Sequence, residues 1–251
     1  MEPHEYRTLF EVETSHWWFR ALRRVLLDTC RRLGLGRSSK ILDVGCGTGK
    51  VVQSLRQDLS SHVSGLDCAP AAAPYWAQRQ LRSMCVASVN AMPFLDESFD
   101  AVVGIDVLEC DGVDEAQAPR ECWRVLRAGG YLMLVVPAYN WLMSPEHHRA
   151  VHASRRYTRR RLHRVLAGTP MRVIRMSHLF QTVFVPIAGY RLLRRWRGWK
   201  AGGAPRSELH RMAGPVNEAL FRAVDWERRL LPVMDLPFGS SILAVAQKPV
   251  A

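Results

Sequence analysis

The sequence lacks the features of a secreted, zinc-binding or membrane-spanning chain. Its six cysteines stand singly, with no C-x-x-C pair and no histidines at zinc-ligand spacing, so we expect neither a disulfide framework nor a metal site. The N-terminal stretch MEPHEYRTLFEVETSHWW is charged from residue 2 and has no apolar core of a signal peptide. The longest apolar stretch, VFVPIAGY, is too short to cross a bilayer. We therefore expect a cytoplasmic chain with no transmembrane segment.

Lysine is also scarce, because the chain has four lysines against 31 arginines. The positive charge is concentrated in residues 155–229, where seventeen arginines and one lysine stand against four acidic residues, a net charge of +14. The whole chain carries +12, so the remaining residues are nearly neutral. Such a basic segment is typical of contact with nucleic acid, an anionic membrane surface or an acidic substrate. The alternative is an arginine-rich surface that only contacts water.

The order of apolar patterns favours an α/β fold in one moderate-sized unit, since 251 residues can bury a substantial core. We expect a helix at about 17–33 and strands near 41, 63, 85, 100 and 131 with helices between them. A polar connection at 138–156 comes next. We then expect a helix at about 158–167, a strand at 171–180, helical segments at about 181–197 and 214–231, and a last strand at 240–247.

A glycine-rich turn follows the first expected strand. In KILDVGCGTGK, a short apolar strand runs into Gly45, Gly47 and Gly49, and a segment with helical spacing follows. Dinucleotide-binding turns have the spacing G-x-G-x-x-G, but here Lys50 stands at the third glycine position. Asp43, two residues before the first glycine, would repel a pyrophosphate and attract an ammonium group. The turn therefore favours a ligand with a cationic amino-acid part over a dinucleotide.

Several ordered motifs between residues 40 and 137 resemble class I S-adenosylmethionine-dependent methyltransferases. ILDVGCGTG resembles the first motif of that family, and HVSGLD resembles its second strand, which ends in an acidic residue. ASVNAMPFLDESFDAVVGIDVLEC and RECWRVLRAGGYLMLVVP resemble the blocks around the fourth and fifth strands. The resemblance implies a Rossmann-like, seven-stranded, mostly parallel sheet with an antiparallel last strand.

The connection between the last two expected strands is far longer than a hairpin needs, and we expect it to fold as a helical cap. The whole chain, 1–251, would then be one methyltransferase domain, with a helical cover at 1–39, a cofactor-binding core at 40–137, a substrate-side segment and cap at 138–237, and the last strand at 238–251. Apolar residues at helical spacing and flanking arginines predict an amphipathic cap helix. These are Val183, Phe184, Ile187, Tyr190 and Leu193, with Arg191, Arg194, Arg195 and Arg197.

The resemblance implies S-adenosyl-L-methionine as the cofactor and S-adenosyl-L-homocysteine as its product. It assigns the methionyl part to the glycine turn, the ribose to Asp67, the adenine to the residues after the third strand, and the back of the methionine to those after the fourth. Ser88 stands where the family usually has aspartate, so its hydroxyl would accept without charge assistance.

The N-terminal helix adds Trp18, or its neighbour Phe19, to close the apolar side. Arg20 or Arg23 would meet the cofactor carboxylate, and ordinary helix packing is the alternative for the tryptophans. The cofactor-binding candidates are Trp18, Arg20, Asp43, Gly45, Cys46, Gly47, Gly49, Asp67, Cys68, Ser88, Val89, Asn90, Ile105, Asp106 and Val107.

Methyl transfer requires in-line alignment, and an oxygen or protonated nitrogen acceptor also needs a base. Histidine suits that role near neutral pH. The candidates follow the fifth strand in SPEHHRAVHASRRY, a segment that resembles S-x-x-D-x-x-x-G-H-x-R-R-Y of a bacterial methyltransferase subgroup beginning E-x-x-H-W-W-F. The aspartate is missing here, and the nearest histidine is one position out of register, so a structural histidine is the alternative. The catalytic candidates are His148, His152 and Tyr157, with His147 beside them.

For the acceptor, we expect an oxygen or nitrogen nucleophile of a small-molecule, peptidic or lipid-like compound, with an anionic character that suits the basic segment. The Asn/Asp-Pro-Pro-Tyr tetrapeptide of DNA amino-methyltransferases is replaced by IDVLE, and Cys110 lacks the Pro-Cys context of cytosine C5 enzymes. Nucleic acid is therefore the second choice. A third interpretation is a non-catalytic module that keeps the cofactor fold and uses its arginine- and tryptophan-rich helices to contact a partner or, peripherally, an anionic membrane.

Overall fold

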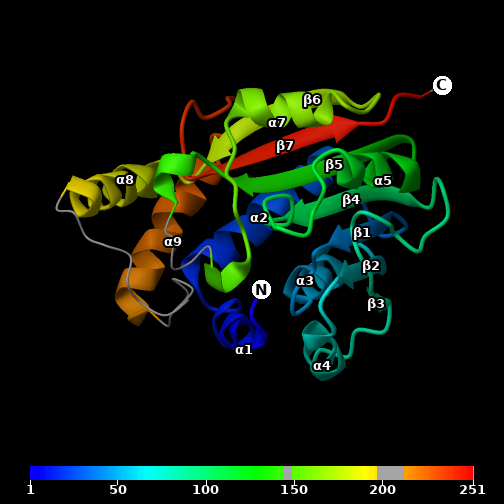
Figure 1. The fold of residues 1–251 in the computed structure, drawn as a ribbon, viewed down its shortest axis with the longest axis horizontal. Coiled ribbons are helices and arrows are strands. Elements are labelled where there is room, and N and C mark those ends of the chain that lie inside the picture. Colours follow the sequence, from blue (N-terminus) through cyan, green and yellow to red (C-terminus); the bar gives the residue numbers. More distant parts are fainter. Residues whose placement is uncertain (144–148, 197–211, 251) are drawn as a thin grey trace.

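A computed structural model of the protein describes residues 1–143, 149–196 and 212–250, and its centre is a seven-stranded sheet with the order β3-β2-β1-β4-β5-β7-β6 (Figure 1). Strands β1 to β5 pair in parallel, whereas β7 runs antiparallel to both of its neighbours. The predicted fold is therefore confirmed. The strands are β1 (Lys40–Val44), β2 (His62–Asp67), β3 (Met84–Val86), β4 (Phe99–Ile105), β5 (Leu126–Pro137), β6 (Arg172–Leu179) and β7 (Ser241–Gln247).

Helices cover both faces of the sheet. On one face lie α2 (Trp17–Arg32), α3 (Lys50–Asp58) and α9 (Gly214–Arg228), and on the other lie α5 (Gln117–Val125) and α7 (Arg159–Leu166). Adjacent residues of one strand belong to different cores, since Ile41 packs in the first and Leu42 in the second, and both are fully buried. A parallel strand that is buried on both faces reads as a continuous apolar run. This explains why Ile41, Leu42 and Val44 are all apolar although they do not all face the same side of the sheet.

An additional helix, α1 (Pro3–Val12), precedes the predicted N-terminal helix. Proline at its first position fits a helix start, because that backbone position has no intrahelical partner to lose. The helix buries Tyr6 and Val12 against the rest of the protein. Short elements elsewhere are η1 (Pro70–Ala72), α4 (Ala73–Gln78) and η2 (Asn140–Leu142).

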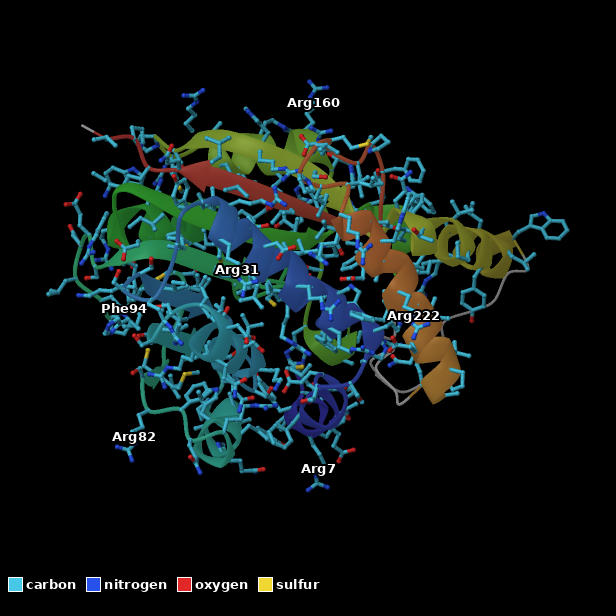
Figure 2. The ribbon with its side chains drawn as sticks, turned by 180° about the vertical axis from the view of Figure 1, so that it is seen from behind. Arg7, Arg31, Arg82, Phe94, Arg160 and Arg222 are labelled. Atoms are coloured by element: carbon cyan, nitrogen blue, oxygen red, sulfur yellow. The ribbon has the colours of Figure 1, made fainter. Side chains whose placement is uncertain are left out.

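The long connection between β6 and β7 contains α8 (Gln181–Trp196) and α9. Helix α9 lies along α2 (Figure 2), where Arg24 Nη1 is 3.0 Å from Asp225 Oδ2 and the Trp17 backbone N–H donates to Asn217 Oδ1 at 2.7 Å. Helix α8 projects away from the sheet in both views. Among the described residues no helix combines the length and apolarity that a membrane span requires.

The predicted apolar stripe of α8 is buried only at its start. Val183 is buried, whereas the side chains of Tyr190 and Trp196 are 57% and 83% exposed. Only the base of α8 therefore packs on the sheet, and its outer half is available to something other than this chain's core.

Candidate active site

The glycine turn joins β1 to α3 and lies against the segment that follows β4. Gly45, Gly47 and Gly49 have φ angles of 66°, 51° and 84°, in the region that favours glycine. A Cβ atom at Gly45 would lie 2.6 Å from Cγ2 of Val107, and one at Gly49 would lie 2.6 Å from Cδ1 of Leu81. The turn therefore needs glycine at these two positions, both for the backbone conformation and for space. It also brings the glycine-rich segment against the predicted cofactor-binding segment after β4.

Asp43 is buried beside this turn, and one of its carboxyl oxygens lacks a hydrogen-bond partner among the described residues. Its side chain is 2% exposed, and Oδ2 has no hydrogen-bond partner among the described residues. Burial and the nearby charge of Asp67 raise the pKa of Asp43 well above its ordinary value. Because an unpaired buried carboxyl is unfavourable, a ligand that supplies an ammonium donor here would remove the penalty. This is the group that the sequence led us to expect.

Asp67, the last residue of β2, is held in a fixed orientation. Its Oδ2 accepts from the backbone N–H of Gly47 at 2.9 Å, and its Oδ1 accepts from the Tyr6 hydroxyl and the Ala69 backbone N–H, each at 3.0 Å. Burial and the Asp67 charge raise the pKa of Tyr6, so its hydroxyl stays protonated and donates. Tyr6 thus occupies one of the hydroxyl positions that the ribose was expected to take.

The E-x-x-H-W-W-F segment anchors the N-terminal helices to the glycine turn. The Glu13 carboxylate is buried, and it accepts hydrogen bonds from the Thr48 hydroxyl and from Arg79, whose Nη2 lies at 2.5 Å. His16 precedes α2 and caps it, because its Nδ1 accepts from the Trp18 backbone N–H at 3.3 Å. Sequence reasoning missed Glu13, although its fixed spacing before His16 was the available signal.

A tryptophan also holds the turn from the side of α4. The Nε1–H of Trp76 donates to the Gly47 carbonyl at 2.7 Å, and the Arg79 Nε–H donates to the Thr48 carbonyl at 3.1 Å. Cys46 is buried within the turn, and its backbone N–H donates to the Leu66 carbonyl at 2.9 Å. The turn is thus fixed by several elements before any ligand is considered.

The residues predicted to recognise adenine follow β3, but their side chains are partly engaged. Asn90 donates through Nδ2 to the Gly112 carbonyl at 2.9 Å and accepts through Oδ1 from the Asp114 backbone N–H at 3.0 Å. The Ser88 hydroxyl accepts from the Asn90 backbone N–H at 3.1 Å, and Val89 is buried. The Asn90 side chain binds the loop after β4, and its contact with adenine stays a prediction. Ser88, Val89 and the exposed Cys68 remain predicted contacts.

Arg20 faces another helix, α9. The Arg20 guanidinium pairs with Glu218 at 2.9 Å and lies 3.7 Å from the ring centroid of Phe221, both on α9. The alternative, Arg23, donates to the backbone carbonyl of Glu13 at 2.6 Å. Both arginines thus have partners within the protein, and their contact with the cofactor carboxylate stays a prediction.

The Trp18 ring packs 4.8 Å from Phe19 and 5.9 Å from Phe180, measured between ring centroids. These contacts match the helix-packing alternative for the tryptophan pair.

Three non-glycine residues with positive φ lie at the carboxyl ends of three strands. Asp106 after β4, Tyr139 after β5 and Phe180 after β6 have φ angles of 48°, 56° and 64°. Such conformations are unfavourable and are frequent at functional sites. The Asp106 backbone N–H donates to Val135 at 2.9 Å, and Pro137 and Leu179 both pair with Ser241 of β7, so the three turns share one edge of the sheet.

Asp106 has an environment of its own at this edge. Its side chain is exposed to solvent, yet enough protein surrounds the carboxyl that desolvation raises its pKa to about 7, against the opposing effect of Arg156. Ile105 and Val107 on either side are partly buried. Asp106 is followed by Val107, whose side chain lies against Gly45.

The catalytic candidates do not form one cluster in the described residues. His148 and His147 lie outside those residues. His152 is on the surface, where its Nε2 is 2.7 Å from Glu2 Oε1. Tyr157 is completely buried, burial raises its pKa, and its hydroxyl donates to the Leu108 carbonyl at 3.0 Å. Tyr157 therefore packs in the core, and its role as a base stays a prediction.

A tyrosine and a histidine that the sequence analysis did not select lie at the same edge. The Tyr139 hydroxyl is 3.1 Å from Nε2 of His178, and the two rings stack at 5.6 Å with planes 14° apart. Tyr139 could have been found by its position just after the fifth strand. His178 gave no signal, because it lies within the apolar pattern of β6.

Residues 42–134 match the family model described as a methyltransferase domain. The chain contains a class I S-adenosylmethionine-dependent methyltransferase domain. The cofactor of this methyltransferase domain is S-adenosylmethionine, as predicted. The unpaired carboxyl of Asp43 and the glycine turn fit the amino-acid part of that cofactor.

Known proteins similar to this methyltransferase domain differ in what their names say they act on. A probable S-adenosylmethionine-dependent methyltransferase of Mycolicibacterium smegmatis is 33% identical over 132 residues, covering 52% of this chain and 49% of the relative. The sterol 24-C-methyltransferase erg6 of Aspergillus fumigatus is 31% identical over 146 residues, covering 53% of this chain and 37% of the relative. The chain thus spans about half the length, or less, of these relatives.

The fold of the methyltransferase domain also occurs in a solved structure of geranyl diphosphate C-methyltransferase from Streptomyces coelicolor A3(2). That structure has a TM-score of 0.58 and 16% identity, and the match covers 92% of this chain and 82% of the other. At this identity the similarity concerns the fold alone.

Proposed function

We propose that the protein transfers the methyl group of S-adenosylmethionine to an oxygen or nitrogen nucleophile of a small-molecule, peptidic or lipid-like acceptor. The observation that carries the proposal is the buried, unpaired carboxyl of Asp43 beside the glycine turn. When bound, S-adenosylmethionine supplies an electrophilic methyl group on a sulfonium. The contribution of the chain is to hold that methyl group in line with the acceptor, which is worth about 7–11 kcal/mol of barrier in favourable cases.

Each part of the site has a role in this proposal. Asp43 binds the amino group of the ligand, the backbone at Gly45 and Gly47 lies against its methionyl part, and Asp67 accepts from a ribose hydroxyl in place of Tyr6. The residues after β3 hold the adenine. Asp106 and its neighbours Ile105 and Val107 contact the back of the methionine, since Val107 lies against Gly45.

The acceptor belongs on the side of β5 and β6, because the cofactor residues occupy the ends of β1, β2 and β4. Aromatic side chains collect there, with Tyr139 stacked 6.0 Å from Trp141 and 5.7 Å from Phe184. Aromatic surfaces favour flat or apolar ligands. One of the similar proteins described above is named for an apolar compound, a sterol. An acceptor with an apolar body is therefore the proposed class.

Calorimetry with S-adenosylhomocysteine tests the cofactor site. Replacing Asp67 with alanine should weaken binding at least tenfold, because the ribose hydroxyls lose an acceptor in a partly buried place, at a cost of about 1–3 kcal/mol. Asp58→Ala, at the exposed end of α3, is the matched control and should leave the dissociation constant unchanged. An unchanged constant for Asp67→Ala, or tighter binding of NAD than of S-adenosylhomocysteine, would contradict the proposal.

The outer half of α8 favours a second role, peripheral contact with an anionic membrane. Leu192 and Trp196 are 55% and 83% exposed, and the sequence from 191 to 197 adds four arginines. A helix with exposed apolar side chains and cationic neighbours suits the boundary between acyl chains and acidic headgroups. This role would bring the protein to a lipid-like acceptor.

Sedimentation with phosphatidylserine-containing vesicles tests this second role. We expect the protein to bind them at low salt and to be released at high salt, because the attraction is electrostatic. Trp196→Ser should weaken binding severalfold. Leu95→Ser is the matched control, because Leu95 is also 83% exposed and follows Phe94, which Figure 2 labels at the opposite end of the molecule from α8. Equal binding to neutral vesicles, or no effect of Trp196→Ser, would count against the membrane role.

A further inference from the structure

The contact between Tyr139 and His178 joins two segments at the edge where the acceptor is proposed to bind. Tyr139 follows β5 and is only partly buried, whereas His178 lies near the end of β6 and is buried. Their side chains meet at 3.1 Å between the hydroxyl oxygen and Nε2. Tyr139 is held there in a left-handed conformation, with φ of 56° and ψ of 113°. Its orientation is therefore maintained at a conformational cost, which is common where a side chain has a functional task.

The partners of His178 fix which ring nitrogen carries the proton. Nδ1 lies 3.3 Å from the backbone carbonyl of Leu236, which can only accept, so Nδ1 is the protonated nitrogen. Nε2 is then an acceptor, and the Tyr139 hydroxyl donates to it. This leaves the lone pairs of the Tyr139 oxygen available to a further donor.

The charge state of the histidine agrees with this assignment. Burial lowers the pKa of His178, the backbone carbonyl of Leu236 opposes this, and Arg159 on α7 lowers the pKa further. The other ionisable group beside His178 is Tyr139, whose pKa is raised by burial, so it is neutral. The imidazole is therefore uncharged at pH 7 and can receive a proton.

We propose that Tyr139 and His178 form a proton relay that activates a planar, hydroxyl-bearing acceptor. This inference rests on the proposed methyltransferase function and deepens it, since it names the group that receives the proton. Tyr139 contacts the acceptor and is the catalytic residue. His178 acts through Tyr139.

The reaction at this relay balances without any other reactant. The acceptor oxygen forms a bond to the methyl carbon while the carbon–sulfur bond breaks, and the electron pair of that bond stays on sulfur. The acceptor hydroxyl proton passes to the Tyr139 oxygen as the Tyr139 proton passes to Nε2 of His178. The products are a methyl ether, S-adenosylhomocysteine and an imidazolium, which then loses its proton to water.

The surroundings of the relay indicate a flat acceptor. Tyr139 stacks on Trp141 with planes 28° apart, and Phe184 of α8 lies against both rings and 5.5 Å from Phe238. Trp141 is exposed on this edge. Offset stacking between aromatic planes at such distances is favourable, so a phenol is the acceptor class that best matches the relay and its neighbours.

Nuclear magnetic resonance of the ligand-free protein tests the relay directly. Selective 15N labelling of histidine should show that His178 carries its proton on Nδ1 and not on Nε2 at pH 7.5. Tyr139→Phe should shift the Nε2 resonance, because its donor is lost, while His163→Gln on the exposed face of α7 should not. A wild-type His178 protonated on Nε2 would overturn the proposal.

Turnover with 2-naphthol, 7-hydroxycoumarin and 4-phenylphenol tests the role in catalysis. We expect wild-type protein and His163→Gln to methylate at least one of these phenols, and Tyr139→Phe and His178→Gln to lower turnover about 100-fold at unchanged affinity for S-adenosylhomocysteine. Wild-type turnover should fall at low pH as His178 becomes charged, below its ordinary pKa of 6.5, and His178→Gln should lose this dependence.

The outcomes separate the relay from the proposed function. If S-adenosylhomocysteine does not bind wild-type protein, the proposed function fails. If it binds but none of the three phenols is methylated, or both variants keep wild-type turnover, the relay is wrong while the cofactor assignment stands.

Discussion

Replacing Asp43 with asparagine is expected to weaken S-adenosylhomocysteine binding while stabilising the ligand-free protein at pH 8. The carboxyl is buried without a partner, and its pKa is raised well above 3.8 in the folded state. Between the unfolded and the folded pKa, the folded state holds a proton that the unfolded state has released, so the free energy of unfolding falls as the pH rises. Asparagine is neutral at every pH and removes this loss.

The two measurements should move in opposite directions. Calorimetry should show binding weaker by about 10- to 100-fold, since a hydrogen bond to a charged group contributes about 1.5–3 kcal/mol. Thermal unfolding without ligand should show a higher melting temperature for Asp43→Asn than for wild type at pH 8, and little difference near pH 4. Asp58→Asn, at an exposed position, is the control. A variant that is less stable at pH 8 would mean that the Asp43 charge itself holds the glycine turn.

Removing the Glu13 carboxylate is expected to produce the largest loss of stability among the single changes considered. Glu13 and Arg79 are both buried, and their side chains meet at 2.5 Å. In Glu13→Ala the guanidinium of Arg79 stays buried without its counter-charge, which typically costs about 3–5 kcal/mol. The change also frees the Thr48 hydroxyl, so the glycine turn loses one of its connections to the N-terminal segment, while the connection through Asp67 and Tyr6 remains.

A double-mutant cycle in urea isolates this pair. Glu13→Ala should be strongly destabilising, whereas Glu13→Ala combined with Arg79→Met should be less destabilising than the sum of the single changes, because no buried charge is left unpaired. Arg7→Ala, on the exposed side of α1, should change the free energy of unfolding by less than about 0.5 kcal/mol. Strict additivity of the two buried changes would show that the pair contributes nothing as a pair.

The parts of the fold that follow from local pattern could be predicted from the sequence. Strands β1 and β4 are apolar on both faces, and the spacing of Gly45, Gly47 and Gly49 specifies a sharp turn, so no distant residue is needed to infer them. The orientation of Asp67 also follows from its place at the end of β2, since Gly47 lies opposite it. In each of these cases the residues that determine the local structure lie close together in the sequence.

The remainder depends on partners that are far apart in sequence. Arg20 pairs with Glu218, which is 198 residues away in the sequence, and Tyr139 contacts His178, which is 39 residues away. No spacing rule in the sequence links the members of either pair. The R-R-Y match drew attention to Tyr157, but the residue type alone could not show that this tyrosine is buried with its hydroxyl bonded to the backbone. Tertiary packing decides which side chains of a helix or loop contact other parts of the protein.

The position of β7 has a consequence for how the chain acquires this shape. Ser241 of β7 pairs with Pro137 of β5 and with Leu179 of β6, so β6 gains its connection to the sheet only after residues 241–247 have been synthesised. Until then a nascent chain on the ribosome carries an open edge on β5 and an unpaired β6, and such edges recruit other chains. Pairing across so long a stretch is also slow. The half of the sheet where we propose that the acceptor binds is thus the last to be completed, and we expect the tendency to aggregate to be greatest before β7 has paired.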